Sequence, residues 1–575
     1  MADEPVPRSD DATAVLALAD RYWTAVLEAA PSSATLLGIH DHDDRLEDLS
    51  VESDERLRTR LTDLADQLTR TSATDDRTRV TASLLAHQLQ TAVEAIDLRL
   101  TEMASDHMLG PHASLLMSVP QMTYPEPAQA AAALTRYAQV PRMLGQALDR
   151  FRDGIDSGRT PAAAVVDRSI HALDQYLATP ESQDPFLMPV LPTEPNGDEW
   201  RDASRWRADA SALVHDVIRP AFAVYADVLR DELLPIARDD EHVGWCHLPD
   251  GDAMYAALMR AHTTLERSPE ELHRLGRERT EVVLPEEYAV LGREVFGTTD
   301  LHSLFQRLRS DPKLRHRDAE EVVSVAKATV ERATAAMVDW FGRLPESPCA
   351  VLPVPDFLAA DAPYAYYYPP AVDGSRGGTY FINTANPTET SRTEAESIAF
   401  HEAIPGHHLQ IAISQELDDL PEFQRHDGAT SYVEGWGLYA ERLADEMGLY
   451  SGPIDRLGML TADSWRSARL VVDTGLHAMG WSRQQAVDYF VTNTPVPVDQ
   501  VLAEVDRYLA MPGQALSYKV GQLHIQELRE QARAELGEAF AIPEFHDVVL
   551  GSGAVTLSVL TDLVDRWVRD RRSPP

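Results

Sequence analysis

The chain has 575 residues, which is long for a single hydrophobic core and predicts two or more lobes. Its composition, 44% hydrophobic and 25% charged, is typical of a globular protein and not of a disordered one. The 92 acidic and 52 basic residues give a formal charge of −40. This charge argues against a general nucleic-acid binder or a binder of anionic membranes, because both need a surplus of lysine and arginine.

The number of cysteines and the length of apolar runs limit the metal ligands and the cell compartments that we expect. Cys246 and Cys349 are too few for a disulfide framework or a thiolate cluster, so any metal would be held by histidine and carboxylate. The N-terminus is acidic and lacks the basic and apolar regions of a signal peptide. No run approaches the roughly 18 apolar residues that a membrane span needs. We therefore expect a cytoplasmic protein that binds neither nucleic acid nor membrane.

The first 344 residues read as one helix after another and are assigned to an N-terminal lobe, 1–344. Apolar residues recur at helical spacing in residues 11–30. A longer amphipathic pattern covers residues 199–238 and is interrupted at Pro220. Ser268, followed by proline and then by Glu271, is typical of a capped helix start.

The pattern changes near residue 345, where prolines and tyrosines become frequent. Residues 378–384 are β-branched and aromatic and predict a short strand. Helices resume at Ser391, which forms a second capping pattern with Glu394, and they continue to the C-terminus. The fold class is therefore predominantly α-helical, with one small sheet (about 350–385) ahead of a metal-binding helix in a catalytic lobe, 345–575.

The most unusual motif is FHEAIPGHHLQ, residues 400–410. Zinc peptidases commonly place H-E-x-x-H on a helix, so that two histidines face one metal and the glutamate acts on water. Here proline occupies the second histidine's position. At about 100° per residue, His407 would lie on another face from His401, and His408 would lie about 10 Å along the axis.

Pro405 and Gly406 make a regular helix improbable at this point, because proline removes a donor and crowds the preceding turn. If two residues bulge out around Ile404 and Pro405, His407 takes the place of the usual second histidine. We therefore expect His401 and His407 to bind a metal, with His408 as the alternative. The competing interpretation is three histidines on a helix surface or in ordinary hydrogen bonds.

A third ligand is commonly a carboxylate on a following helix, with one position left open for water. Glu434 lies among aromatic residues and glycines in a predicted helix, residues 431–442, and is the expected ligand. The glycines at 435 and 437 would permit close packing. Glu441 shares the face of Glu434 and would support the ligands without binding the metal. Both glutamates could instead be surface residues.

Four segments resemble the domain-of-unknown-function 885 family of predicted bacterial zinc metallopeptidases, and the helical layout extends the likeness over most of the chain. The variant PGHH is more specific than a bare H-E pair. The segments are HEAIPGHHLQ (401–410), EGWGLY (434–439), RLVVDTGLH (469–477) with GW at 480–481, and PGQALSY (512–518).

Members of this family are similar in fold to the carboxypeptidase Taq family, a long and nearly all-helical shell around a deep channel with zinc at its floor. The resemblance therefore implies that the N-terminal lobe forms the wall or lid of a channel. It implies zinc peptidase chemistry in the second lobe, with no particular substrate.

Zinc peptidases need donors for the oxyanion that forms at the carbonyl. In similar helical zinc peptidases, a histidine and a tyrosine from C-terminal helices fill this role, which points to His477 and Tyr518. Asp473 precedes His477 by one turn and could orient it. Both residues have structural alternatives, a core histidine satisfied by Asp473 and a packed tyrosine.

The predicted strand could be an edge to which a peptide adds through main-chain hydrogen bonds. Gly378 and Tyr380 are therefore candidate substrate-binding residues, although a strand that only supports the core is a close alternative. A carboxypeptidase also needs a cation for the terminal carboxylate. Arg466, Arg469 and Lys519 are near suitable segments, and none of them is singled out.

The combined prediction is a zinc peptidase with one zinc ion per chain, held by His401, His407 and Glu434, and with Glu402 as general base. Its partner is a peptide substrate, either a short peptide or a C-terminus. One alternative is an amidohydrolase that acts on a small non-peptide amide, and another is a non-catalytic scaffold whose structural metal has a fourth ligand such as His408 or Glu441. The oligomeric state stays open, with a homodimer as one option. Acidic residues in the channel would favour basic peptides.

Overall fold

The computed structural model describes residues 10–194, 196–354, 363–370 and 377–572. Most of these residues are helical, and three short strands form one mixed sheet. The predominantly helical fold with a small sheet ahead of the motif helix is therefore confirmed. Within the described ranges, no helix has both the length and the apolar character that crossing a bilayer requires. Residues 355–362 and 371–376 of the predicted strand segment lie outside the described residues.

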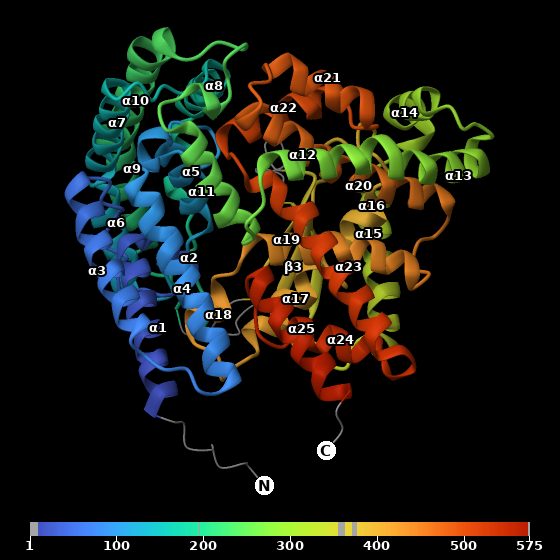
Figure 1. Ribbon diagram of the computed structural model, residues 1–575. Coiled ribbons are helices and arrows are strands. Elements are labelled where there is room, and N and C mark those ends of the chain that lie inside the picture. Colours follow the sequence, from blue (N-terminus) through green and yellow to red (C-terminus); the bar gives the residue numbers. More distant parts are fainter. Residues whose placement is uncertain (1–9, 195, 355–362, 371–376, 573–575) are drawn as a thin grey trace.

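Helices from the first part of the chain gather on one side of the molecule, drawn in blue to green in Figure 1. The helices between residues 111 and 233 enclose a core around Tyr137, Trp206 and Phe222, whereas those between residues 10 and 97 form a separate cluster that includes Phe423. These helices are α1 (Asp10–Ala29), α2 (Pro31–Leu36), α3 (Val51–Thr69), α4 (Asp76–Asp97), α5 (Pro111–Ser118), α6 (Pro127–Tyr137), α7 (Val140–Asp156), α8 (Ala163–Ala178), α9 (Ala203–Leu213), α10 (Arg219–Val228) and α11 (Gly251–Thr263).

Three predictions for this part are confirmed. The first helix covers almost the predicted residues, 11–30. Ser268 caps α12 (Pro269–Glu278), and Glu271 completes the capping box. The pattern over 199–238 is interrupted near Pro220, but the chain does not leave the helix there. A π-helical turn, Val214–Ile218, precedes the proline and accommodates a residue that has no backbone N–H.

The second part of the chain supplies the sheet and most of the helices on the other side of Figure 1, whereas its residues 422–426 lie against α1. Its elements are α12 (Pro269–Glu278), α13 (Leu284–Phe296), α14 (Leu301–Ser310), α15 (Ala319–Ala336), β1 (Cys349–Pro353), β2 (Ala365–Tyr368), β3 (Gly378–Ile382), α16 (Ala395–Glu402), α17 (His407–Gln415), α18 (Glu422–His426), α19 (Thr430–Glu446), α20 (Pro453–Ala478), α21 (Arg483–Asn493), α22 (Val498–Ala510), α23 (Ser517–Leu536), α24 (Ile542–Leu550) and α25 (Leu557–Arg572).

The predicted strand exists as β3, but it is not an edge strand. The strand order is β1-β3-β2, with β1 parallel and β2 antiparallel to β3. Both sides of β3 are therefore paired within the protein, and its backbone has no groups left for a substrate peptide. The expectation of an edge at this strand is wrong, because its two partners lie earlier in the chain and pair with it only in the folded state.

The helix predicted to begin at Ser391 begins later, at Ala395. The preceding residues form a bridge, a bend and a turn instead. Ser391 forms a β-bridge with Arg315, and the backbone N–H of Arg392 donates to the carbonyl of Leu314. These contacts with a distant segment compete successfully with the local capping pattern.

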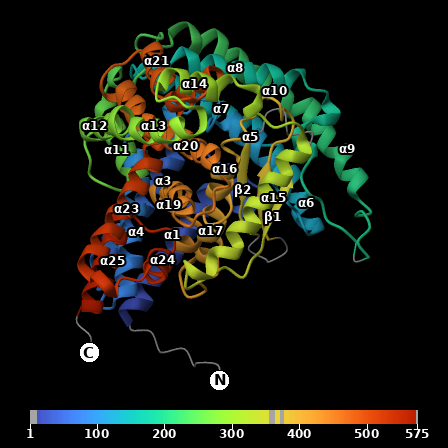
Figure 2. The ribbon, with the colours of Figure 1, turned by 90° about the vertical axis from the view of Figure 1, so that its right-hand side faces the viewer.

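The helices of the motif lie in the interior, in a layered arrangement. Figure 2 shows α16 and α17 between the sheet and α15 on one side and α19 and α23 on the other. The apolar cluster in this region includes Tyr255 and Val322 as well as Phe400, Trp436 and Leu528, so it draws on both sides of residue 345. The boundary between lobes at residue 344 stays a prediction, and two such lobes would share this core.

Helices α19 and α23 approach each other at a pair of glycines. A Cβ atom on Gly435 would lie 2.5 Å from the Cα of Gly521, so neither position has room for a side chain. The two backbones therefore cross in direct contact, and this crossing fixes α19, the helix that carries Glu434 and Glu441, against its neighbour.

Candidate metal centre

The motif helix is broken, as its proline and glycine predict. Helix α16 ends at Glu402 and α17 begins at His407, with a turn between them that contains a cis Ile404–Pro405 bond. The indole N–H of Trp436 donates to the carbonyl of Pro405 at 2.9 Å and anchors the turn. A Cβ atom on Gly406 would overlap the carbonyl oxygen of His401, so this turn requires glycine.

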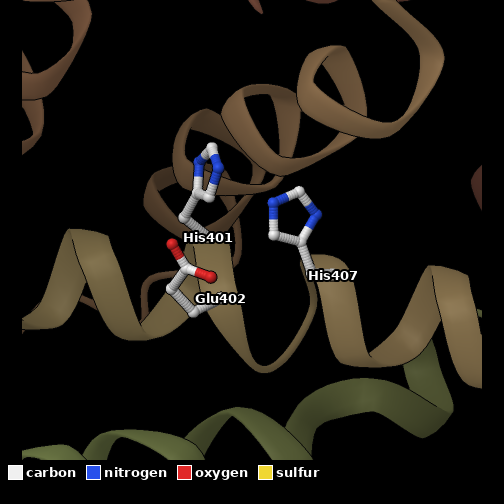
Figure 3. A group of neighbouring side chains, drawn as sticks. All are labelled: His401, Glu402 and His407. Carbon is white, nitrogen blue, oxygen red and sulfur yellow. The ribbon is translucent and has the colours of Figure 1, made fainter. Parts of the chain in front are cut away.

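The break brings His407 beside His401. Figure 3 shows the two imidazole rings and the carboxylate of Glu402 gathered around the turn. The ring centroids of His401 and His407 are 4.7 Å apart, with the ring planes at 85°. One ligand atom from each of His401, Glu402 and His407 lies within 4.8 Å of the other two. These three residues therefore form a group that could hold a metal ion.

Glu434 reaches the same point from α19. Its Oε2 atom lies 3.5 Å from Nε2 of His401 and also 3.5 Å from Nε2 of His407. This separation is long for a hydrogen bond, but it matches the edge of about 3.4 Å between ligand atoms in a tetrahedral zinc site with bonds near 2.1 Å. The donor set thus fits a divalent ion, with Glu402 and Glu434 as the two carboxylates within reach.

Glu441 supports His401 from behind. Nδ1 of His401 lies 2.8 Å from Oε1 of Glu441, and the hydroxyl of Ser397 donates to Oε2 of the same carboxylate at 2.6 Å. A carboxylate on Nδ1 directs the other ring nitrogen toward the metal position and makes it a stronger donor. Ser397 was not singled out from the sequence, although its place one turn before His401 on the same helix face would have indicated it.

The electrostatics of the site favour added positive charge. Burial disfavours the imidazolium of His401, but Glu434 and Glu441 outweigh burial and raise the pKa of His401 to about 9. Burial would also raise the pKa of Glu434, yet the imidazoles of His401 and His407 hold it well below its ordinary value. Burial raises the pKa of Glu402, against the opposing charges of His407 and His401. Three carboxylates around two imidazoles suit a divalent cation.

His408, the alternative ligand in the sequence analysis, is used elsewhere. Its Nδ1 lies 3.0 Å from the hydroxyl of Tyr367, and its Nε2 lies 3.0 Å from the carbonyl of Ser347. Burial lowers the pKa of His408 to about 4, so the ring is neutral. Both nitrogens are engaged, and His408 joins α17 to the sheet and its flanking loop instead of facing the metal position.

Gly437 makes room for His401. A Cβ atom at this position would lie 2.7 Å from both Cε1 and Nε2 of the imidazole. We expect Gly437→Ala to displace the ring and to lower the free energy of unfolding by about 1–3 kcal/mol, as overpacking in a core does. Zinc affinity should fall as well, which competition with a chromogenic chelator would measure. Gly448→Ala, at a positive-φ glycine with no neighbouring atoms, is the control, because it strains the backbone but should leave zinc affinity unchanged.

Tyr518 lies against the site. Its ring is stacked on His401, with centroids 6.3 Å apart and planes at 23°. The guanidinium of Arg469 lies 4.4 Å from the ring centroid on Tyr518, and Nη2 of Arg507 donates to the phenol oxygen at 3.4 Å. Because the phenol oxygen accepts from arginine, its own proton is available to another acceptor.

His477 is not available as a donor. The backbone N–H of Trp245 donates to its Nδ1 at 3.3 Å, and its Nε2 lies 3.0 Å from the carbonyl of Tyr508. Burial lowers the pKa of His477 to about 3. Asp473 accepts a hydrogen bond from Tyr255 at 2.6 Å and does not orient His477, contrary to the prediction. His477 is therefore a neutral histidine of the core, as the structural alternative predicted. Its hydrogen-bond partners, however, are backbone groups and not Asp473.

The two candidate substrate-binding residues of the strand are packed inside the protein. The space above Gly378 is filled by His408 and Tyr367, and a Cβ atom there would lie 2.5 Å from Nδ1 of His408. Tyr380 is fully buried in the apolar cluster. Neither residue presents groups to a substrate, because β3 is the central strand and supports the core.

The three candidate cations differ in their surroundings. Lys519 is fully buried and pairs with Asp463. Arg469 donates to the hydroxyl of Tyr508 at 2.9 Å and pairs with Glu504 at 3.0 Å. Arg466 lies on the same helix, α20, and has no comparable partner among the described residues.

Comparisons with known proteins extend over nearly the whole chain. A family model described as "Bacterial protein of unknown function (DUF885)" matches residues 31–564. A solved structure from Colwellia psychrerythraea, provisionally described as a lipoprotein, has a TM-score of 0.88 at 27% identity over 97% of this chain and 99% of that chain. A second, from Shewanella oneidensis and provisionally described as a lipoprotein of unknown function, has a TM-score of 0.73 at 15% identity over 95% and 99%, and shows a shared fold alone. None of the curated proteins compared with the chain matches it.

Proposed function

This chain belongs to the DUF885 family of bacterial proteins, and from that premise we propose that it is a zinc-dependent metallopeptidase acting on short peptides or on peptide C-termini. The observation that carries the proposal is the convergence of His401 and His407 on one oxygen of Glu434, with Glu402 beside them. A relationship to the carboxypeptidase Taq fold, with a channel leading to the site, is part of this proposal.

The residues of the site divide into ligands and a base. His401, His407 and Glu434 would hold one ion per chain, and imidazole with carboxylate suits zinc best. Such an ion, when bound, supplies Lewis acidity that polarises a carbonyl and makes water a better nucleophile at neutral pH. Glu402, next to His401 in the chain, takes the proton of the attacking water and delivers it to the leaving amine. The carbon–oxygen bond forms and the carbon–nitrogen bond breaks.

Tyr518 takes the role of oxyanion donor. His477 does not share this role, because both of its ring nitrogens are engaged with backbone groups. We expect Tyr518→Phe to lower kcat for peptide hydrolysis by about 10²- to 10³-fold, because the phenol donates to charge that develops only in the transition state. KM and zinc content should change little. Steady-state kinetics together with metal analysis test this. A variant whose kcat equals that of the wild type would remove Tyr518 from the mechanism.

Two alternatives use the same residues differently. A closed structural site needs a fourth protein ligand, but His408 bonds to the sheet and its flanking loop, and Glu441 bonds to Nδ1 of His401. This arrangement favours a catalytic site over a scaffold. An amidohydrolase acting on a small non-peptide amide would share the metal ion and the base, and only its substrates distinguish it from a peptidase.

Metal removal tests the proposal as a whole. The purified protein should contain about one zinc per chain by plasma mass spectrometry, since a site of this type holds a single ion. Dialysis against a chelator should abolish cleavage of a mixed peptide library, and equimolar zinc should restore it. If zinc is bound and the protein cleaves small amides but no peptide, the result would favour the amidohydrolase. Absence of any bound divalent metal after gentle purification contradicts the proposal.

The peptide partner, the oligomeric state and the compartment stay predictions. The sequence analysis predicts the cytoplasm, whereas the related structures are provisionally described as lipoproteins, which favours the cell envelope. Immunodetection of the natural protein in soluble and membrane fractions would separate the two locations.

A further inference from the structure

Among the residues that the structure describes, Arg466 is a buried cation without a counter-ion. Its side chain is on α20 and the residue is 9% exposed, and its Nε–H is buried with no hydrogen-bond partner. Its one hydrogen bond, from Nη1 to the carbonyl of Ala462, is long at 3.4 Å. No carboxylate in the described part of the chain lies within ion-pairing distance of it. In a protein with 92 acidic and 52 basic residues, an arginine that is buried and unpaired is a marked exception.

The neighbouring cations do not share this property. Arg469 pairs with Glu504 at 3.0 Å, and Arg507 donates to the side chain of Gln514 at 2.9 Å. These contacts hold the guanidinium groups in place around Tyr518. Nη1 of Arg469 is also buried without a hydrogen-bond partner, but Arg469 has a counter-ion, whereas Arg466 has none in the described part of the chain.

Arg466 faces the same side of α20 as Arg469, one turn away. The two guanidinium groups lie 4.6 and 4.7 Å from the ring centroid of Trp465, which fixes both of them. Arg469 in turn covers Tyr518, whose ring is stacked on His401. Arg466 therefore lies beside the metal centre and not in a distant part of the core.

The positive charge of Arg466 acts on the carboxylate of Glu402. Burial raises the pKa of Glu402, and the positive charges of His407, His401 and Arg466 oppose that rise. Arg466 thus acts on Glu402 through its charge without forming an ion pair with it, and its charge likewise opposes the raised pKa of Glu394.

We propose that Arg466 binds the C-terminal carboxylate of the peptide substrate and so makes the protein a carboxy-terminal exopeptidase. This inference rests on the proposed peptidase function. Water attack at the last peptide bond releases one free amino acid and a peptide shortened by one residue. Arginine suits this task because its fork of donors matches both oxygens of a carboxylate.

The position of Arg466 agrees with the dimensions of a peptide. The carbon of the terminal carboxylate lies within about 4 Å of the last peptide carbonyl carbon, because only two bonded atoms separate them. A cation that binds this carboxylate must therefore lie near the general base without forming an ion pair with it. Arg466 has this relation to Glu402.

The test compares tripeptides Ala-Ala-X, with X as Leu, Phe or Arg, as free acids and as carboxamides. For the wild type we expect kcat/KM to be at least about 30-fold higher for the free acids, the smallest effect usual for a buried charge pair. Arg466→Gln should lose this preference through a higher KM for the free acids, so that it cleaves free acids and carboxamides with similar kcat/KM. Arg466→Lys should recover part of it, because it keeps the charge but not the fork. Arg277→Gln, at an exposed arginine on α12, is the matched control and should keep the preference.

Binding gives a second readout that is independent of cleavage. Calorimetry with Glu402→Gln should detect the free acids and not the carboxamides, and the added Arg466→Gln should remove the difference. The inference is overturned if the wild type cleaves free acids and carboxamides equally well, or if Glu402→Gln binds them equally well. A preference for free acids that persists in Arg466→Gln also overturns it. If Ala-Ala-Asp carboxamide is the only carboxamide that competes with the free acids, Arg466 binds a side-chain carboxylate. The exopeptidase mode is then wrong. Failure to cleave any peptide, with discrimination in binding retained, would count against the peptidase function and not against this subsite.

Discussion

Glu402→Gln is expected to lower kcat for peptide hydrolysis by about 10²- to 10⁴-fold while zinc content stays at one ion per chain. Glutamine keeps the size of the side chain but cannot accept the proton of the attacking water. Kinetics on a substrate found in the peptide library, combined with plasma mass spectrometry, measure both quantities on the same sample.

Glu434→Gln is the matched comparison, because both carboxylates lie near the two imidazoles. If Glu434 is the ligand, its amide variant should lose zinc affinity by more than about 100-fold, beyond what the loss of a supporting partner costs. If the two variants behave in the opposite way, Glu402 is the ligand and the assignment of the base is wrong. Turnover by Glu402→Gln at the wild-type rate would exclude it as base.

His407→Gln is expected to lower zinc affinity by more than about 100-fold and to abolish activity in proportion, because it removes a direct ligand. His408→Gln, at the adjacent position, should leave zinc affinity near that of the wild type. Its amide can still donate to the carbonyl of Ser347, which His408 bonds at 3.0 Å. Chelator competition on the two purified variants gives the affinities.

Thermal unfolding separates the two histidines further. His408→Gln should lower Tm in the presence and absence of zinc alike, since it weakens the contact between α17 and the sheet. His407→Gln should lower Tm only relative to the zinc-loaded wild type, because the ligand-linked stabilisation is lost. Zinc loss in His408→Gln with retention in His407→Gln would reverse the assignment.

The parts of this site that could be predicted from sequence are those that depend on local chemistry. Pro405 and Gly406 break a helix wherever they occur, so the displacement of the second histidine from the usual spacing to His407 follows from the residues themselves. The pairing of Glu441 with His401 likewise follows from its place on the face of α19 that carries Glu434.

The parts that could not be predicted depend on contacts between distant segments. The ring nitrogens of His477 are satisfied by backbone groups of Trp245 and Tyr508, and nothing near His477 in the sequence reveals them. The central position of β3 is set by two earlier strands in the same way. The lack of a counter-ion for Arg466 among the described residues is also non-local, because it depends on where the carboxylates of distant segments come to lie.

The turn between α16 and α17 has a consequence for how such proteins are found. Removal of Pro405 and Gly406 would leave His-Glu-Ala-Ile-His, which is the plain zinc-peptidase signature. The chain therefore carries that signature with a two-residue insertion that the turn absorbs. A genome scan with fixed spacing overlooks every site of this kind, whereas a scan that allows a proline-glycine pair before the second histidine would retrieve them.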